Sequence, residues 1–279
     1  MRGWWCGHDG GGYEGKKAMS NKRTDTTDSD LKKAAENAWF ALRGARESVA
    51  TLREQDANTW WPHNQSEATT LAWSIALEWM ALRFPQDLFW LYSTWGTSEG
   101  KAPRQLKEQL LKRYDVRYLG HGEENYRQFR SRRQLSTMWP QQFMVDFSTY
   151  SFAANSNRFL LTMESEVASS HSVDGRIERN CGYAWDYGKL LFIESPLRLF
   201  VARVGGKNGA TGDVRRRELL SNLNELTGKV LGEMDDQRGP GKVLRVLYIL
   251  GSERAARALP IVAVWNGKSF VTTTDDSVG

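Results

Sequence analysis

Two glutamates, Glu164 and Glu166, follow an apolar run in the stretch RFLLTMESEV, residues 158–167. The run predicts a β-strand, and side chains two residues apart in a strand lie on the same face of the sheet. Two like charges at the end of a core-type strand repel each other and lose hydration. The pair therefore requires either a compensating cation or a functional site that uses the two negative charges.

A third acidic residue, Asp146, stands in the preceding β-rich run QFMVDFSTY, residues 142–150. A hairpin between the two runs would bring Asp146 close to Glu164 and Glu166. Hard divalent cations take oxygen ligands, and Mg²⁺ often uses one or two carboxylates together with phosphate oxygens. A bound cation would neutralise the repulsion, activate water and stabilise charge developing on a phosphate. The three carboxylates therefore predict a Mg²⁺ site, with Mn²⁺ as an alternative occupant.

Plainer interpretations of the same residues stay open at this point. A single Asp within a strand is usually a turn or edge residue, and the two glutamates could line a solvated sheet face. Leu160 shares their parity, however, so that face begins partly apolar. Glu67 follows Asn64 by three residues, which is the spacing of a capping box, and we expect it to be a helix cap rather than a ligand.

Hydrophobic periodicity predicts the elements that must position these residues. Helices are expected over 29–54, 65–83, 103–114, 183–195 and 214–234. Strands are expected over 87–94, 116–120, 142–150, 158–167, 197–204 and 242–250, and over 261–265 and 269–273, which are joined by an Asn266-Gly267 hairpin turn. This alternation predicts a mixed α/β sheet rather than a helical bundle or a β-sandwich.

An Asp on one strand followed by Glu-x-Glu on the next resembles the PD-(D/E)xK nuclease superfamily, whose fold is restriction-endonuclease-like. The step from Asp146 to Glu164 fits that family's loose spacing, and the predicted order from 65–83 to 197–204 is similar to its αβββαβ core. The stretches VDFSTY, RFLLTMESE and WDYGKLLFIESPLRLFVARV also resemble a divergent, uncharacterised prokaryotic group that has an ExE motif. Val167 and Ala168 stand where a tryptophan is expected in that group.

The resemblance implies a magnesium-dependent nuclease that hydrolyses phosphodiester bonds, most plausibly in DNA, and by analogy a role in prokaryotic defence. Asp146 and Glu164 would hold the metal, and Glu166, which stands where most members have lysine, would assist the metal or the water. Lys189, on the 183–195 helix, would replace that lysine as an electrostatic helper. A structural alternative places Lys189 and Asp186 as charges favoured by the helix dipole.

Positive charge is concentrated in residues 101–133, which contain ten Lys or Arg against four Asp or Glu. The whole chain of 279 residues has a net charge of only +5. The segment is expected to follow a phosphate backbone, although a solvated helix face with a basic loop is the plainer alternative. The candidate nucleic-acid-binding residues are Arg127, Arg130, Arg132 and Arg133.

Composition predicts a cytoplasmic protein with no membrane segment. No apolar run approaches the ~18 residues of a membrane span, and residues 1–20 have no apolar core typical of a secretory signal. The two cysteines and four histidines have no metal-ligand spacing, which argues against zinc. Twelve tryptophans indicate a core rich in large aromatic side chains.

We expect three regions: a disordered lead-in over 1–28, a helical N-terminal part over 29–114, and the restriction-endonuclease-like core over 115–279. Met19 is an alternative start to Met1. Cutting both strands of a duplex would favour a homodimer, and a larger defence complex is a further expectation. Two other functions remain open: a catalytically inactive nuclease-like fold acting as a nucleic-acid-binding or assembly module, and a protein–protein interaction factor with an aromatic surface.

Overall fold

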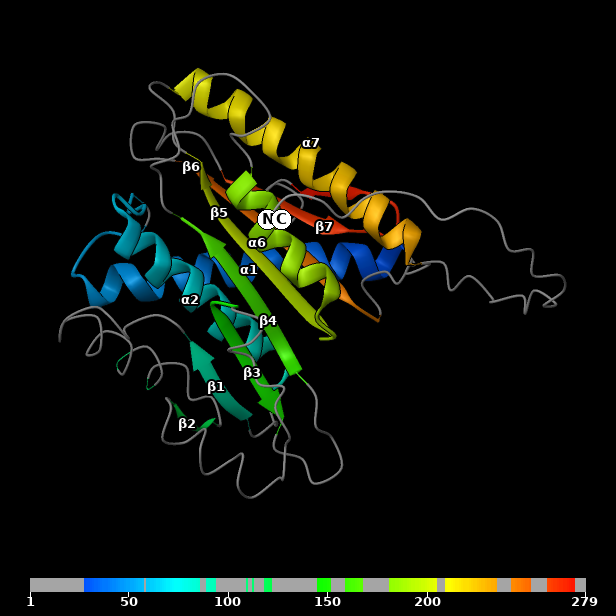
Figure 1. Ribbon diagram of the computed structural model, residues 1–279. Helices are drawn as coiled ribbons and strands as arrows, with labels where there is room; N and C mark the ends of the chain where they lie inside the picture. The colour runs from blue at the N-terminus through cyan, green and yellow to red at the C-terminus, as the bar shows by residue number, and fades with distance from the viewer. Residues whose placement is uncertain are drawn as a thin grey trace, which may run out of the picture.

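A central sheet with helices on both faces forms the part of the chain that the computed structural model describes (Figure 1). The described residues are 28–57, 59–85, 89–93, 109, 112, 118–121, 145–151, 159–167, 181–204, 209–234, 242–251 and 260–273. The helices are α1 (Asp28–Leu52), α2 (Gln65–Arg83), α6 (Cys181–Phe192) and α7 (Gly209–Glu233). The strands are β1 (Phe89–Ser93), β2 (Tyr118–His121), β3 (Phe147–Ser151), β4 (Phe159–Glu166), β5 (Leu197–Val204), β6 (Leu244–Gly251), β7 (Ile261–Trp265) and β8 (Phe270–Thr273).

The eight described strands lie in the order β2-β1-β3-β4-β5-β6-β7-β8. The pairs β1–β3 and β3–β4 are antiparallel, whereas β4, β5 and β6 run parallel to one another. Parallel neighbours need a crossover connection, and α6 and α7 supply the crossovers from β4 to β5 and from β5 to β6. The predicted mixed α/β sheet is thereby confirmed.

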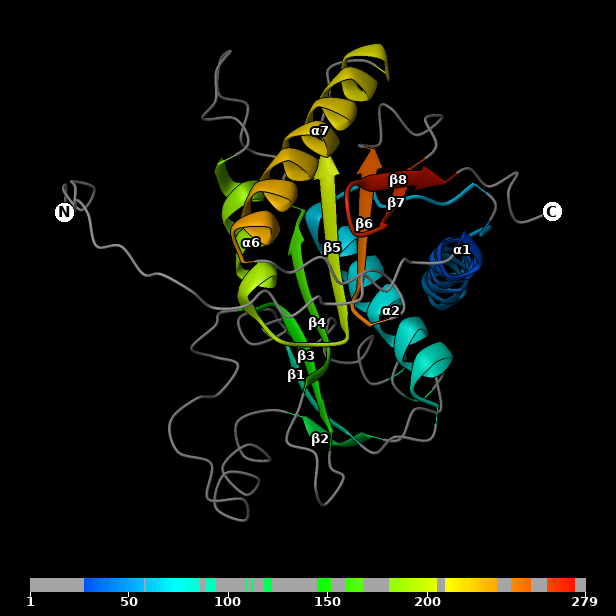
Figure 2. The same cartoon turned by 90° about the vertical axis from the view of Figure 1, so that its right-hand side faces the viewer.

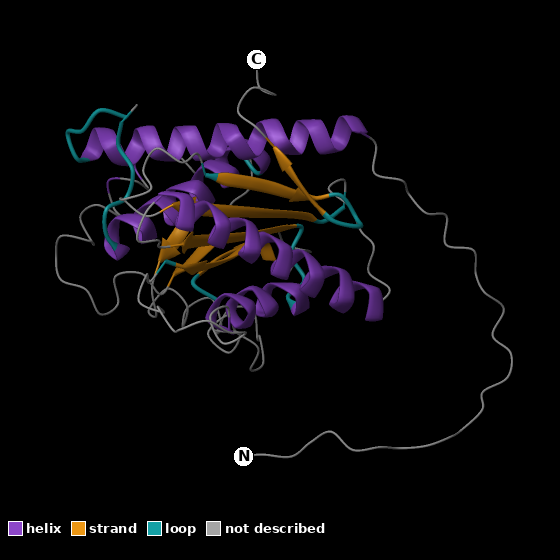
Figure 3. Cartoon of the chain, turned by 90° about the horizontal axis from the view of Figure 1, so that it is seen from above, coloured by secondary structure: helices purple, strands orange, loops and turns teal. Residues whose placement is uncertain are grey.

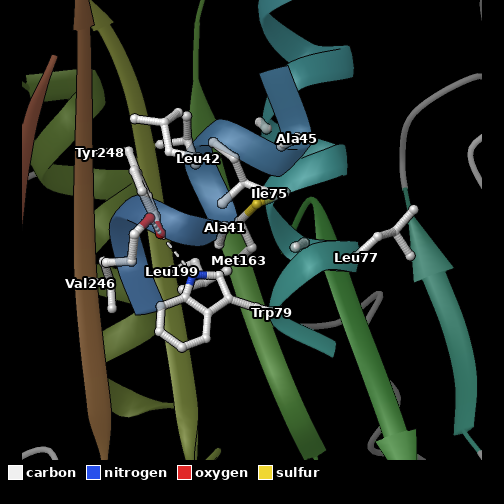
Figure 4. Packing of buried hydrophobic residues seen from close by; sticks show 14 of the residues in the cluster. Ala41, Leu42, Ala45, Ile75, Leu77, Trp79, Met163, Leu199, Val246 and Tyr248 are labelled. Atoms are coloured by element: carbon white, nitrogen blue, oxygen red, sulfur yellow. Dashed lines mark hydrogen bonds between the residues drawn. The ribbon is translucent and has the colours of Figure 1, made fainter. Parts of the chain in front are cut away.

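The sheet is covered by α1 and α2 on one face and by α6 and α7 on the other (Figures 2 and 3). Strands buried on both faces read as continuous apolar runs, and all eight residues of β5 are buried. Leu199 of β5 packs in the cluster that includes α1 and α2 residues, whereas Phe200 packs with residues of α6 and α7. The alternation along β5 therefore separates two cores, and the first of them is seen in Figure 4.

The start of α2 and the turn between β7 and β8 lie where local sequence signals predict them. The Asn64 side chain caps α2 by accepting a hydrogen bond from the Glu67 backbone N–H at 2.9 Å, as the capping-box spacing predicts. The predicted hairpin is also present, since β7 and β8 are antiparallel neighbours. Gly267 in that turn has a φ of 101°, a conformation that glycine adopts readily.

Two sequence-based expectations need correction. The resemblance takes the strand expected over 116–120 as the first of the three core strands, but β1 is the antiparallel neighbour of β3, and β2 lies one position further out, parallel to β1. The strand expected over 142–150 begins only at Phe147, so Asp146 lies in a bend immediately before β3. The helix expected over 103–114 is described only at Gln109 and Lys112, and both are helical.

Candidate active site

Glu164 lies near the carboxyl end of β4, on the sheet face that α6 and α7 cover. Its ladder partner in β5 is Phe200, which packs with Tyr187, Leu190 and Leu191 of α6. Partners in a parallel ladder point to the same face, so the Glu164 side chain is directed beneath α6. The residue is only 1% exposed, which makes its carboxyl group the most buried of the predicted site residues that the structure describes.

Lys189 of α6 is the cation that meets this carboxyl group. Its Nζ lies 3.2 Å from Glu164 Oε1 and 2.7 Å from Asp186 Oδ1. Lys189 and Asp186 are three residues apart on α6, a spacing at which helical side chains are neighbours. The helix crosses over β4, so sequence positions 164 and 189 meet in the fold (Figure 1).

Burial raises the pKa of Glu164 to about 9, and the nearby Asp146 carboxylate adds to the shift. Lys189 opposes it with both its charge and a hydrogen bond, but does not overcome the loss of hydration. Burial also disfavours charge on Lys189, yet the hydrogen bond with Asp186 and the charge of Glu164 outweigh it and raise the pKa of the ammonium. At neutral pH the site therefore holds a protonated Glu164 beside a charged Lys189.

Asp146 is held in place from β4. Its Oδ2 accepts hydrogen bonds from the backbone N–H and the Oγ of Ser165, both at 2.8 Å. Ser165 stands between the two glutamates, so Asp146 is fixed beside the acidic end of β4 even though it is not itself a strand residue. Nothing in the residue pattern singled out Ser165, because a serine between two glutamates has no distinctive spacing.

Glu166 lies one step further along the same face and interacts with a different partner. Burial, and after it the charge of Glu166, raises the pKa of Tyr183 to about 12. The Tyr183 hydroxyl donates to the backbone carbonyl of Arg203 at 2.9 Å. Tyr183 and Arg203 were not identified from the sequence, and only the fold shows that they lie near Glu166.

The structure describes some of the other candidate residues and leaves others outside the described ranges. Glu67 is a structural residue: its carboxylate accepts from the Arg53 guanidinium at 2.9 Å and from the His63 backbone N–H at 2.7 Å. Asp186 would lie in the first turn of a helix that began at residue 183, as expected from the sequence, but α6 begins at Cys181 and places it in the second turn. Arg127, Arg130, Arg132 and Arg133 lie outside the described residues, and their role in nucleic-acid binding stays a prediction.

The carboxylates fit a cation held by two protein ligands better than one held by three. Within the described ranges no group of three His, Cys, Asp or Glu side chains is arranged to hold a metal ion. Asp146 and Glu164, however, form a pair whose full ionisation a cation would favour, because the charge of Asp146 disfavours ionisation of Glu164. One or two carboxylates are the usual protein share of a Mg²⁺ site.

The fold and the site define an α/β protein whose sheet has a buried carboxyl–lysine pair where α6 crosses β4. No described helix is long and apolar enough to cross a membrane. Comparison with protein-family models, with curated proteins and with solved structures finds no match for this chain.

Proposed function

We propose that the protein is a metal-dependent nuclease of the restriction-endonuclease-like class, with its centre at Asp146, Glu164 and Lys189. The observation that carries the proposal is the buried Glu164 carboxyl group between a carboxylate and an ammonium. Burying ionisable groups together costs free energy, so strongly perturbed groups of this kind concentrate at functional sites. The substrate that suits such a centre is a phosphodiester, and DNA is favoured over RNA by the family resemblance.

The chain topology supports the same assignment. Apart from β2, the described elements from α2 to β5 have an αβββαβ order: α2, the antiparallel strands β1, β3 and β4, the crossover helix α6 and the parallel strand β5. The strand β2 is inserted between β1 and β3 in the chain and lies at the edge of the sheet. In this arrangement the acidic positions lie at the start of β3 and the end of β4, which are neighbours in an antiparallel pair.

Each residue has a role that its contacts allow. Asp146 and Glu164 would hold Mg²⁺, or Mn²⁺ in its place, and the ion would lower the pKa of a bound water and polarise the phosphate. Ser165 fixes the orientation of Asp146 through two hydrogen bonds. Lys189 would offset negative charge that develops on the scissile phosphate, and Asp186 keeps its ammonium charged and in position. Glu166 would assist the metal or the water.

Cleavage of plasmid DNA, single-stranded DNA and RNA with Mg²⁺ or Mn²⁺ tests the proposal. Asp146→Asn and Glu164→Gln should each abolish cleavage, since both carboxylates are required, and EDTA should do the same. Glu225→Gln, an exposed position on α7, is the matched control and should cleave at the wild-type rate. Cleavage that persists in both site variants would refute the proposal.

A second candidate function, a nuclease-like fold that binds nucleic acid without cutting it, is favoured by the Lys189–Glu164 contact itself. A Glu164 that is protonated at neutral pH, with an ammonium beside it, needs no metal to neutralise it. This candidate predicts nucleic-acid binding at low salt with no cleavage under any metal condition, and binding unchanged by EDTA.

A further inference from the structure

The outer face of α6 carries two exposed aromatic side chains beside the candidate active site. Trp185 is 75% exposed and Phe192 is 65% exposed, whereas Tyr187, Leu190 and Leu191 of the same helix are buried. Residues seven apart lie on one line of a helix, about 10 Å apart along its axis. The composition suggests that tryptophans belong to the core, and Trp39, Trp60, Trp73, Trp79 and Trp265 do, but Trp185 does not.

Gly188 lies between the two rings on the same face. A Cβ added there would meet nothing within 4 Å, so packing in the described structure gives no reason for a glycine. Glycine inside a helix costs about 1 kcal/mol relative to alanine. We call Trp185, Gly188 and Phe192 the aromatic strip: two exposed aromatic residues, with open space at the glycine that lies between them along the helix.

The strip is adjacent to the charges of the site. Lys189 follows Gly188 directly, is four residues from Trp185 and three from Phe192, and has its ammonium at Glu164. The Lys189 ammonium also lies 2.7 Å from Asp186, the sequence neighbour of Trp185. The aromatic strip therefore lies directly beside the Lys189–Glu164 pair of the candidate site, and no other exposed large apolar side chain is present on the described part of α6.

We propose that unpaired bases of a single-stranded nucleic acid stack on the strip of Trp185, Gly188 and Phe192, with the backbone passing Lys189. Every base has a π-face, so aromatic stacking together with backbone-tracking cations is the usual means of sequence-tolerant single-strand binding. Isolated rings separated by a glycine suit planar bases better than they suit the continuous apolar core of a protein interface. This role rests on the nuclease function and specifies its substrate as an unpaired strand.

Fluorescence anisotropy with a labelled oligothymidylate, measured in EDTA so that no cleavage occurs, tests the stacking role. Trp185→Ala and Phe192→Ala should each weaken binding about tenfold, with a smaller effect on the matching duplex. Phe40→Ala is the matched control, because Phe40 is 54% exposed but lies on α1, across the sheet.

Gly188→Leu separates stacking from folding. Leucine is a better helix former than glycine, so this variant should keep or raise stability while it blocks the gap and weakens oligothymidylate binding. Gly228→Leu on α7, where an added Cβ also meets nothing within 4 Å, should leave binding unchanged.

The outcomes distinguish the stacking role from the nuclease function. Wild-type oligothymidylate affinity in both aromatic variants would overturn the stacking role, whether or not the protein cleaves. An equal loss of duplex affinity would also overturn it, as would a changed oligomeric state with normal oligothymidylate binding, which would identify the strip as a contact between copies. Weakened single-strand binding in a protein that never cleaves would support the strip and refute the nuclease.

Discussion

Glu164 has a cation on one side, a carboxylate on the other and almost no contact with water. Its pKa is raised from 4.5 to about 9, chiefly by burial. Between these two pH values the unfolded chain has lost the proton that the folded chain retains. The folded state then binds more protons than the unfolded state, so the free energy of unfolding decreases as pH rises through this window.

Glu164→Gln should remove that dependence. The free energy of unfolding of the variant, measured relative to the wild type by urea titration without metal, should increase steadily from about pH 5 to about pH 9. The groups facing Glu164 (Asp146, Lys189 and Asp186) are unchanged in the variant. Glu225→Gln should instead show an offset that does not vary with pH. A constant offset for Glu164→Gln would mean that Glu164 titrates normally.

Lys189→Met should separate metal binding from catalysis. Removing the ammonium takes away a cation 3.2 Å from Glu164, so Mn²⁺ affinity should stay the same or increase. Cleavage should decrease about 10²–10³-fold, because the charge that we propose to stabilise the transition state is lost. Steady-state kinetics with parallel Mn²⁺ titration measure both, and Lys229→Met on the exposed side of α7 is the control. Loss of metal binding in Lys189→Met would contradict this division of roles.

Elements whose ends depend on local chemistry were predictable from the sequence. The Asn64–Glu67 spacing marked the start of α2, and the Asn266-Gly267 pair marked the hairpin of β7 and β8. The position of Asp146 was harder to predict, because its β-rich neighbours do not indicate where the ladder between β3 and β4 ends. The meeting of Lys189 with Glu164 depends on how α6 lies over β4, and that packing is not encoded in any short spacing.

Asn64→Ala tests the cap of α2. The variant loses the hydrogen bond to the Glu67 N–H and should decrease the free energy of unfolding by about 1 kcal/mol. Gln65→Ala, at an exposed neighbouring position, should have little effect. Thermal denaturation measures both, and equal midpoints for the two variants would show that the cap does not contribute.

Buried hydrogen bonds join the α1 and α2 layer to the sheet. On the α1/α2 side, Tyr248 of β6 accepts a hydrogen bond from Trp79 Nε1 of α2 at 2.7 Å and donates to the Ala38 carbonyl of α1 at 3.0 Å. All three residues are buried, and Figure 4 shows Trp79 and Tyr248. This side has a structural role, whereas the predicted site residues that the structure describes, apart from Glu67, lie on or beside the α6/α7 face.

Tyr248→Phe should destabilise the whole molecule without changing the site. The variant leaves the buried Trp79 N–H without its partner, which costs about 1–3 kcal/mol. Trp79→Phe and the double variant complete a cycle in which the second substitution should cost less after the first. Equilibrium unfolding gives these values, and cleavage by the folded variants should remain at the wild-type rate. Additive losses would indicate that the hydrogen bond contributes nothing.

Calorimetric titration of the protein with Mn²⁺ tests the metal centre most directly. We predict one saturable site, with about one proton released at neutral pH, because the protonated Glu164 must ionise to become a ligand. Binding should be lost in Asp146→Asn and in Glu164→Gln and retained in Glu225→Gln. Mn²⁺ binding that is undetectable in the wild type, or equal in all four proteins, would contradict a metal site at Asp146 and Glu164.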